Sequence, residues 1–407
     1  MEARIMKINL YIRTKLSVMM FIQFFIWGAW AVTLGTYLGK TLAFEGTQIG
    51  LIYGTTAIAA IVSPLFVGFV ADRYFASQRV FSTLHFAGAI FLYLASQAST
   101  FSSIYILLLI YSLCYMPTLA IANGISFRHL TDPDRQFPLV RVLGTIGWIV
   151  AGLMVGFLGM EDRNIPLQIA AGMSLLLGAY GFMLPHTPPQ PSNEPRTVAR
   201  MLGFDAFALL RKRSFLVLFI ASVLISIPLA FYYNFTNLFL NEIGMENAAG
   251  KQTLGQQSEV LFMLLMPFLM RRMGIKWMVA VGMLAWTVRY ILFAFGNADP
   301  ATVWMLYAGI VLHGICYDFF FVAGQIYANR EAPESLKNSV QAIMALGTYG
   351  VGMFIGSLIS GWIVSQYTAA DGLKAWDAIW LVPASMAAVV LVLFVIFFKE
   401  DKRESTQ

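Results

Sequence analysis

The sequence predicts an all-α membrane protein with twelve transmembrane helices that form two six-helix bundles related by pseudo-two-fold symmetry. Three observations lead to this fold class: an apolar composition, apolar runs of helical span length, and an uneven distribution of basic residues between successive loops. The chain has 407 residues, of which 58% are hydrophobic and only 12% are charged. A soluble domain carries about 25% charged residues, so the composition excludes a soluble enzyme with one small anchor.

The apolar runs give the expected elements in order. A run of about 20 apolar residues can cross a bilayer as a helix, because a helix satisfies its own backbone hydrogen bonds in lipid. The expected spans are 16–39, 48–71, 79–98, 102–127, 138–160, 165–185, 214–240, 248–271, 275–297, 301–327, 339–366 and 376–398.

A polar stretch separates the first six spans from the last six. Residues 186–195 are rich in proline and indicate an extended linker. Residues 197–213 combine apolar and basic side chains, which predicts an amphipathic helix on the inner membrane surface. We therefore expect an N-terminal six-helix bundle over 1–185, a cytoplasmic linker with an amphipathic helix over 186–213, and a C-terminal six-helix bundle over 214–407.

The loop charges indicate the orientation. With twelve spans, 22 lysines and arginines fall on the side of the two termini, and four fall on the other side, namely Lys40, Arg163, Lys251 and Lys374. Cytoplasmic loops carry such an excess of basic residues. We therefore expect both termini in the cytoplasm. The net charge of +6 then reflects membrane topology rather than binding to nucleic acid.

The two halves of the chain repeat each other. Cys114-Tyr-Met116 in the fourth span matches Cys316-Tyr-Asp318 in the tenth, and Leu-Gly-Thr145 in the fifth matches Leu-Gly-Thr348 in the eleventh. Both pairs are separated by about 200 residues, close to half the chain length. A parallel repeat of six helices is typical of secondary transporters, whose substrate site lies between the halves.

The loop after the second span contains Gly68-Phe-Val-Ala-Asp72-Arg73. This segment resembles the Gly-x-x-x-Asp-Arg signature of the major facilitator superfamily, although Phe75 replaces the usual second glycine. The resemblance implies a structural gating role for Gly68, Asp72 and Arg73, not contact with substrate.

Further motifs along nearly the whole chain carry a narrower resemblance. These motifs are Gln23–Trp30, Tyr115–Thr118, Phe137–Trp148, Gly203–Leu209 and Cys316–Phe320. They are similar to those of the nucleoside–proton symporters of Gram-negative bacteria. The resemblance implies proton-driven uptake of nucleosides across the cell inner membrane by alternating access, with the proton as coupling ion and no other cofactor. It also implies a multi-pass protein that contacts membrane lipid and acts as a monomer.

Among the ionisable residues inside the expected spans, Glu259, Asp318 and Arg289 stand out. An ionisable group at a helix centre costs about 2.5–3.5 kcal/mol on insertion scales. Asp318 lies among aromatic residues that favour its neutral form, which suits a proton carrier. Glu259 shares a helix face with Gln256; the family resemblance implies that this pair binds the ribose, but Glu259 can equally serve in proton coupling. Arg289 is interpreted as part of a buried pair or as a side chain that reaches the headgroups.

Aromatic and polar side chains suggest where the rest of the substrate binds. Arg141, Thr145 and Trp148 are spaced i, i+4 and i+7, so they form one stripe with a stacking face for a base. Tyr233 and Asn237 share a face of the seventh span and are further candidates.

In the tenth span, His313 and Tyr317 share a face next to Asp318. We place both in the substrate site, where His313 either contributes to sugar recognition or adds a titrating group.

Other functions fit the sequence less well. No cluster of residues has metal-ligand spacing, and no nucleophile has a base at a recognisable spacing, so we expect no enzyme. A receptor would need a soluble signalling domain, and an ATP-driven pump would need a phosphate-binding loop with the pattern Gly-x-x-x-x-Gly-Lys-[Ser/Thr]. The sequence contains neither feature. The alternative that stays open is a symporter of the same superfamily for a sugar or another small polar metabolite.

Overall fold

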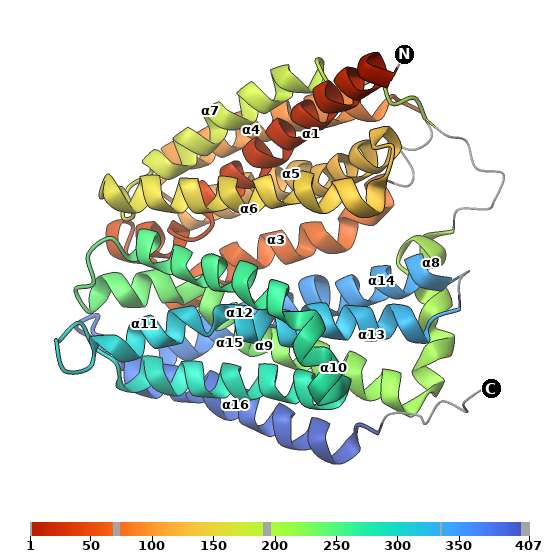
Figure 1. Cartoon of the computed structure of the whole chain (residues 1–407). Coiled ribbons are helices and arrows are strands. Elements are labelled where there is room, and N and C mark those ends of the chain that lie inside the picture. Colours follow the sequence, from red (N-terminus) through yellow and green to blue (C-terminus); the bar gives the residue numbers. More distant parts are fainter. Residues whose placement is uncertain (1, 68–73, 190–196, 334–335, 400–407) are drawn as a thin grey trace. The chain divides into compact units, whose positions relative to one another are not determined.

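The computed structural model describes residues 2–67, 74–189, 197–333 and 336–399. Within these ranges the regular elements are helices, and the single exception is an isolated β-bridge between Thr368 and Lys374. The contacts divide the chain into two compact units (Figure 1). The first unit comprises residues 1–197, 233–241 and 246–253, and the second comprises residues 198–232, 242–245 and 254–407.

The first unit contains the N-terminal helices. They are α1 (Glu2–Trp30), α2 (Leu34–Thr36) with the π-helix η1 (Tyr37–Thr41), α3 (Gly46–Phe66), α4 (Ser77–Gln97), α5 (Phe101–His129), α6 (Pro133–Phe157) and α7 (Ile165–Gly181). The long helix α9 (Arg213–Glu242) begins in the second unit, and its last turns, residues 233–241, belong to the first.

The second unit holds most of the remaining helices. They are α8 (Val198–Met201), the 3-10 helix η3 (Phe204–Arg211), most of α10 (Ala248–Phe295), α11 (Val303–Val311), α12 (His313–Tyr317), the π-helix η4 (Asp318–Val322), α13 (Ala323–Glu331), α14 (Lys337–Ala345), the π-helix η6 (Leu346–Gly352), α15 (Met353–Gln366) and α16 (Trp376–Phe397).

The helices confirm the predicted twelve spans. Ten helical segments in the described part of the chain are long and apolar enough to cross a membrane. One of them, α10, has 48 residues and is interrupted at Gly274, where φ is 71° and ψ is 168°, so it supplies two spans. A residue with a side chain rarely adopts this φ. The shorter apolar helix α7, with 17 residues, is the twelfth.

Close helix packing in the first unit depends on glycines where α1 meets α6. A Cβ at Gly147 would lie 2.1 Å from the backbone oxygen of Phe21, and a Cβ at Gly28 would lie 3.0 Å from Cα of Trp148. Small residues allow two helix backbones to approach in this way in lipid. The contact fixes the face of α6 that carries Trp148.

A buried histidine connects three helices of the same unit. The ring of His85 on α4 lies 2.8 Å from Oε1 of Gln23 on α1 and 3.0 Å from Oγ of Ser174 on α7. Both ring nitrogens therefore have partners, which a buried polar group requires. We interpret His85 as part of the core.

The segment after the linker differs from the expected single amphipathic helix. Gly203 has a φ of 78° and separates α8 from η3, because a left-handed residue interrupts a right-handed helix. Ala206 and Leu209 of η3 are buried in a cluster with Phe215, Val340 and Ile343. The apolar side of this segment therefore packs on protein within the second unit.

Candidate functional site

The predicted stripe on α6 lies against aromatic residues of α1. The guanidinium carbon of Arg141 is 3.9 Å from the ring centroid of Phe24. The ring of Trp148 meets Trp27 edge to face, with centroids 5.7 Å apart. Arg141, Thr145 and Trp148 are each partly exposed. The three side chains can therefore still contact a ligand.

Of the two candidates on α9, Tyr233 is partly exposed and Asn237 is buried. The amide nitrogen of Asn237 donates to Oε2 of Glu161 at 2.8 Å and to Oε1 of Gln252 at 2.9 Å. Its amide oxygen accepts from the Thr36 hydroxyl. The hydrogen-bonding groups of Asn237 are thus used by protein partners, which gives this residue a structural role in the first unit.

Glu161 is the centre of this polar cluster, and sequence reasoning missed it. Its carboxylate also accepts from Nδ2 of Asn241 at 2.8 Å and from the backbone nitrogen of Ala249 at 3.1 Å. The side chain is only 5% exposed. Ala249 lies in the first turn of α10, where backbone N–H groups have no intrahelical acceptor and favour a negative charge. Glu161 therefore ties the end of α9 and the start of α10 to the first unit.

In the second unit, Asp318 begins the π-helical turn η4 and is 0% exposed. Phe319, Phe320 and Phe321 follow it and are also buried. Neither carboxylate oxygen has a hydrogen-bond partner among the described residues. A buried carboxylate without donors is costly to keep charged, and π-helical turns often occur at functional sites.

Tyr317 is partly exposed, and its hydroxyl forms a hydrogen bond with the hydroxyl of Tyr349. Tyr349 lies in η6, a second π-helical segment. The pair links the end of α12, directly before Asp318, to η6.

Glu259 and His313 come together as neighbours on α10 and α12. Nε2 of His313 lies 3.9 Å from Oε2 of Glu259. The Glu259 side chain is 22% exposed, whereas that of His313 is 2% exposed. Gln256 is partly exposed on the same helix as Glu259. Close approach between the helices is allowed by Gly314, where a Cβ would lie 2.5 Å from the backbone of Ser258.

Arg289, for which the sequence allowed two interpretations, is 0% exposed. Its Nη1 lies 3.1 Å from Nδ1 of His313. Its guanidinium carbon lies 3.4 Å from the ring centroid of Tyr232. Arg289 is therefore a buried residue that contacts His313, and it does not reach the headgroups.

The remaining predicted residues, Gly68, Asp72 and Arg73, lie outside the described residues. In the part of the chain that is described, no group of three or more His, Cys, Asp or Glu side chains is arranged to hold a metal ion.

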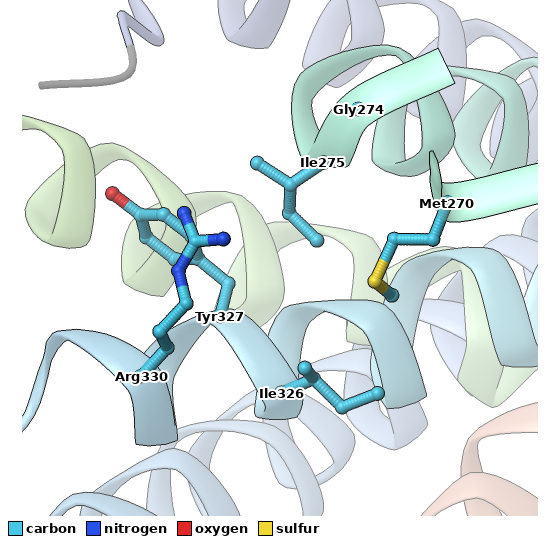
Figure 2. A pocket seen from close by; sticks show the side chains of 6 residues that line it. All are labelled: Met270, Gly274, Ile275, Ile326, Tyr327 and Arg330. Atoms are coloured by element: carbon cyan, nitrogen blue, oxygen red, sulfur yellow. The ribbon is translucent and has the colours of Figure 1, made fainter. Parts of the chain in front are cut away.

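A pocket of about 240 Å³ lies elsewhere in the second unit, between the end of α13 and the interruption of α10 (Figure 2). Figure 2 shows Arg330 and Tyr327 side by side at one end and Met270 at the other, with Ile275 and Ile326 between them. The pocket contains none of the predicted site residues. We assign it no role in substrate binding.

Comparisons with known proteins relate this architecture to transporters. The profile of the nucleoside H+ symporter family matches residues 10–403. The chain is 45% identical over 405 residues to the protein YegT of Escherichia coli (strain K12), which covers 96% of this chain and 95% of that protein. It is 34% identical over 402 residues to the xanthosine permease of the same organism, covering 95% of this chain and 96% of the permease.

A solved structure shows the same fold. The chain superposes on a crystal structure of the nucleoside transporter NupG with a TM-score of 0.91 at 33% identity, covering 95% of this chain and 100% of that one. The nucleoside permease NupG of Escherichia coli (strain K12) is 33% identical over 402 residues, covering 95% of this chain and 96% of the permease. The likeness confirms the predicted fold class. The chain belongs to the nucleoside H+ symporter family.

Proposed function

We propose that this protein imports nucleosides together with protons across the bacterial inner membrane by alternating access. The observation that carries the proposal is Asp318, a fully buried carboxyl group without a hydrogen-bond partner among the described residues, in a chain of the nucleoside H+ symporter family. Such a group is stable in the membrane when it carries a proton and costly when it does not.

Asp318 is the proton carrier in this proposal. Its neighbours Phe319, Phe320 and Phe321 supply no donor to stabilise a carboxylate, so loss of the proton requires a change in its surroundings. Alternating access provides that change, because the group then faces water on one side of the membrane at a time. The proton is the only coupling ion that this chemistry requires.

Substrate recognition divides between base and sugar. The indole of Trp148 supplies a partly exposed face on which a base can stack, and Arg141 and Thr145 supply hydrogen bonds from the same stripe. Glu259 and Gln256 bind the sugar hydroxyls, because both are partly exposed and lie one turn apart. Tyr233 and Tyr317 complete the contacts with their partly exposed rings.

The orientation and the assembly belong to the same proposal. The 22 basic residues on the side of the termini, against four on the other side, favour cytoplasmic termini. The protein acts as a monomer in this proposal.

Counterflow in proteoliposomes tests the substrate class. Vesicles that contain the purified protein are loaded with unlabelled uridine, adenosine or glucose and diluted into the labelled compound. We expect exchange of labelled nucleosides and none of labelled glucose above empty vesicles. Exchange of glucose without exchange of either nucleoside would overturn the proposal in favour of a sugar symporter.

A further inference from the structure

A buried arginine in the second unit has no part in the mechanism described so far. Arg289 is 0% exposed, and its guanidinium carbon lies 3.4 Å from the ring centroid of Tyr232 and 5.7 Å from that of Phe293. Aromatic faces attract a desolvated cation and replace part of its hydration. These contacts hold the charge in place but leave open what it acts on.

The direction of one hydrogen bond shows where Arg289 acts. Its Nη1 lies 3.1 Å from Nδ1 of His313. A guanidinium has only donors, so Nδ1 must be the acceptor and can carry no proton. The proton of a neutral imidazole then resides on Nε2. Arg289 therefore selects one tautomer of His313.

The ring of His313 is held in a single orientation by its surroundings. It stacks on Tyr232 with centroids 5.3 Å apart and an interplanar angle of 23°, and it lies 5.9 Å from the ring of Tyr317. A Cβ at Gly255 would lie only 3.1 Å from Cβ of His313, so α10 closely approaches the backbone end of the side chain. The tautomer thus fixes the direction of the Nε2–H bond as well.

The Nε2–H group of His313 faces Glu259. Nε2 of His313 and Oε2 of Glu259 are 3.9 Å apart, which is too long for a direct hydrogen bond. An oxygen atom at about 2.8 Å from both atoms fits at this separation. Such an oxygen would accept from Nε2–H and donate to the carboxylate, and a sugar hydroxyl has both capacities.

We propose that Arg289 is a positioning residue for substrate recognition: it holds His313 as the Nε2–H tautomer, so that His313 and Glu259 together bind one hydroxyl group of the nucleoside sugar. The inference rests on the proposed function, because it assumes that Glu259 contacts the sugar. It adds a specificity determinant that does not itself touch the substrate. The opposite tautomer would present a bare nitrogen lone pair to the carboxylate and could not form this donor–acceptor pair.

The test compares nucleosides that differ by one hydroxyl. Binding of uridine, 2′-deoxyuridine and 3′-deoxyuridine to the purified protein is measured calorimetrically for the wild type and for Arg289→Met, which removes the donor and keeps an unbranched side chain. In the wild type, we expect one of the two deoxy compounds to bind about 10- to 100-fold more weakly than uridine. In Arg289→Met this ratio should fall to about threefold or less, through weaker binding of uridine and of the deoxy compound that keeps the contacted hydroxyl, while the compound that lacks this hydroxyl binds as it does to the wild type.

Phe293→Leu is the matched control, because Phe293 is a buried neighbour of Arg289 that does not hydrogen-bond to His313. Damage to packing alone should weaken uridine and both deoxy compounds equally and preserve the ratio. A ratio in Arg289→Met that equals the wild-type ratio would overturn the inference and leave the proposed function intact. Failure of the folded wild type to bind any nucleoside would overturn the proposed function, and the inference with it.

A second measurement applies even if Arg289→Met does not fold. The 15N chemical shifts of the histidine rings in the labelled wild type report which nitrogen carries the proton, and His313→Gln identifies the signals of His313. We expect the proton on Nε2. A proton on Nδ1 would contradict the inference directly.

Discussion

Glu161 provides a quantitative test of the first unit, because its carboxylate is the common acceptor of three donors, two of them buried and one partly buried. Replacing it by alanine removes the hydrogen bonds from Nδ2 of Asn237, Nδ2 of Asn241 and the backbone nitrogen of Ala249. Each hydrogen bond to a charged group contributes about 1.5–3 kcal/mol. The loss will be smaller than three times this value, because two of the donors have a second acceptor.

Two of the three donors keep a hydrogen-bond acceptor after Glu161 is replaced. Nδ2 of Asn237 also donates to Gln252 at 2.9 Å, and Nδ2 of Asn241 also donates to the backbone oxygen of Asn237 at 3.0 Å. The backbone nitrogen of Ala249 is left without an intrahelical acceptor. We therefore expect Glu161→Ala to lower the free energy of unfolding by about 2–4 kcal/mol.

The assay is the melting temperature of the purified protein in detergent at one scan rate. A loss of this size should lower the melting temperature by at least about 3 °C. Glu161→Gln keeps one acceptor oxygen and should lower the melting temperature by less than Glu161→Ala does. Glu246→Ala is the control, because Glu246 is an exposed acid of the neighbouring loop. Equal melting temperatures for Glu161→Ala and Glu246→Ala would refute the role given to Glu161.

Three further predictions concern packing and substrate contacts. Gly147→Ala should lower the melting temperature by several degrees, because its Cβ would lie 2.1 Å from the Phe21 backbone oxygen. Gly172→Ala should leave the melting temperature unchanged, because a Cβ there would have nothing within 4 Å. Equal melting temperatures for the two variants would contradict the close packing of α1 and α6. Trp148→Ala should weaken uridine binding by about tenfold or more, as expected for loss of a stacking face, and unchanged calorimetric affinity would remove the indole from the site. Glu259→Gln should weaken nucleoside binding by about tenfold with normal expression, and an unaltered dissociation constant would exclude Glu259 as a sugar ligand.

The sequence predicts the helical architecture well because the signal is local. Each span is a continuous apolar run, so its existence can be read without knowing its neighbours. The break between the spans that end at 271 and begin at 275 agrees with the interruption at Gly274. The segment over 197–213 is less predictable, because a basic amphipathic pattern fits a membrane surface and a protein surface equally well. Leu209 is buried by tertiary contacts, and the sequence pattern of this segment gives no information about such contacts.

The candidate site is predictable only in part, because its contacts join residues that are far apart in the chain. Helical periodicity places Asn237 on a face, but not against Glu161, which lies 76 residues away. The polar loop that contains Glu161 carries no pattern that distinguishes a buried acceptor from a solvated acid. Arg289 and His313 are 24 residues apart, and an arginine in a span is compatible with burial or with contact to headgroups until its neighbours are known.

Asp318 differs from these residues because its chemistry is evident in the sequence. An acid within an apolar span requires a reason for its presence, and the repeat partner Met116 shows that the shared backbone does not require it. The structure adds its complete burial and the π-helical turn η4. The role of Asp318 in proton coupling remains a prediction, which a comparison of uptake by the wild type and by Asp318→Asn tests.

The most direct test measures uridine uptake by proteoliposomes with and without an imposed pH gradient, for the wild type, Asp318→Asn and Asp371→Asn. Asp371 is an exposed acid of the loop before α16, so its replacement controls for the change of carboxylate to amide. The wild type and Asp371→Asn should accumulate uridine when the outside is acidic. Asp318→Asn mimics the protonated group permanently and should exchange uridine in counterflow without accumulating it. Accumulation by Asp318→Asn in response to the pH gradient would show that Asp318 is not the proton carrier.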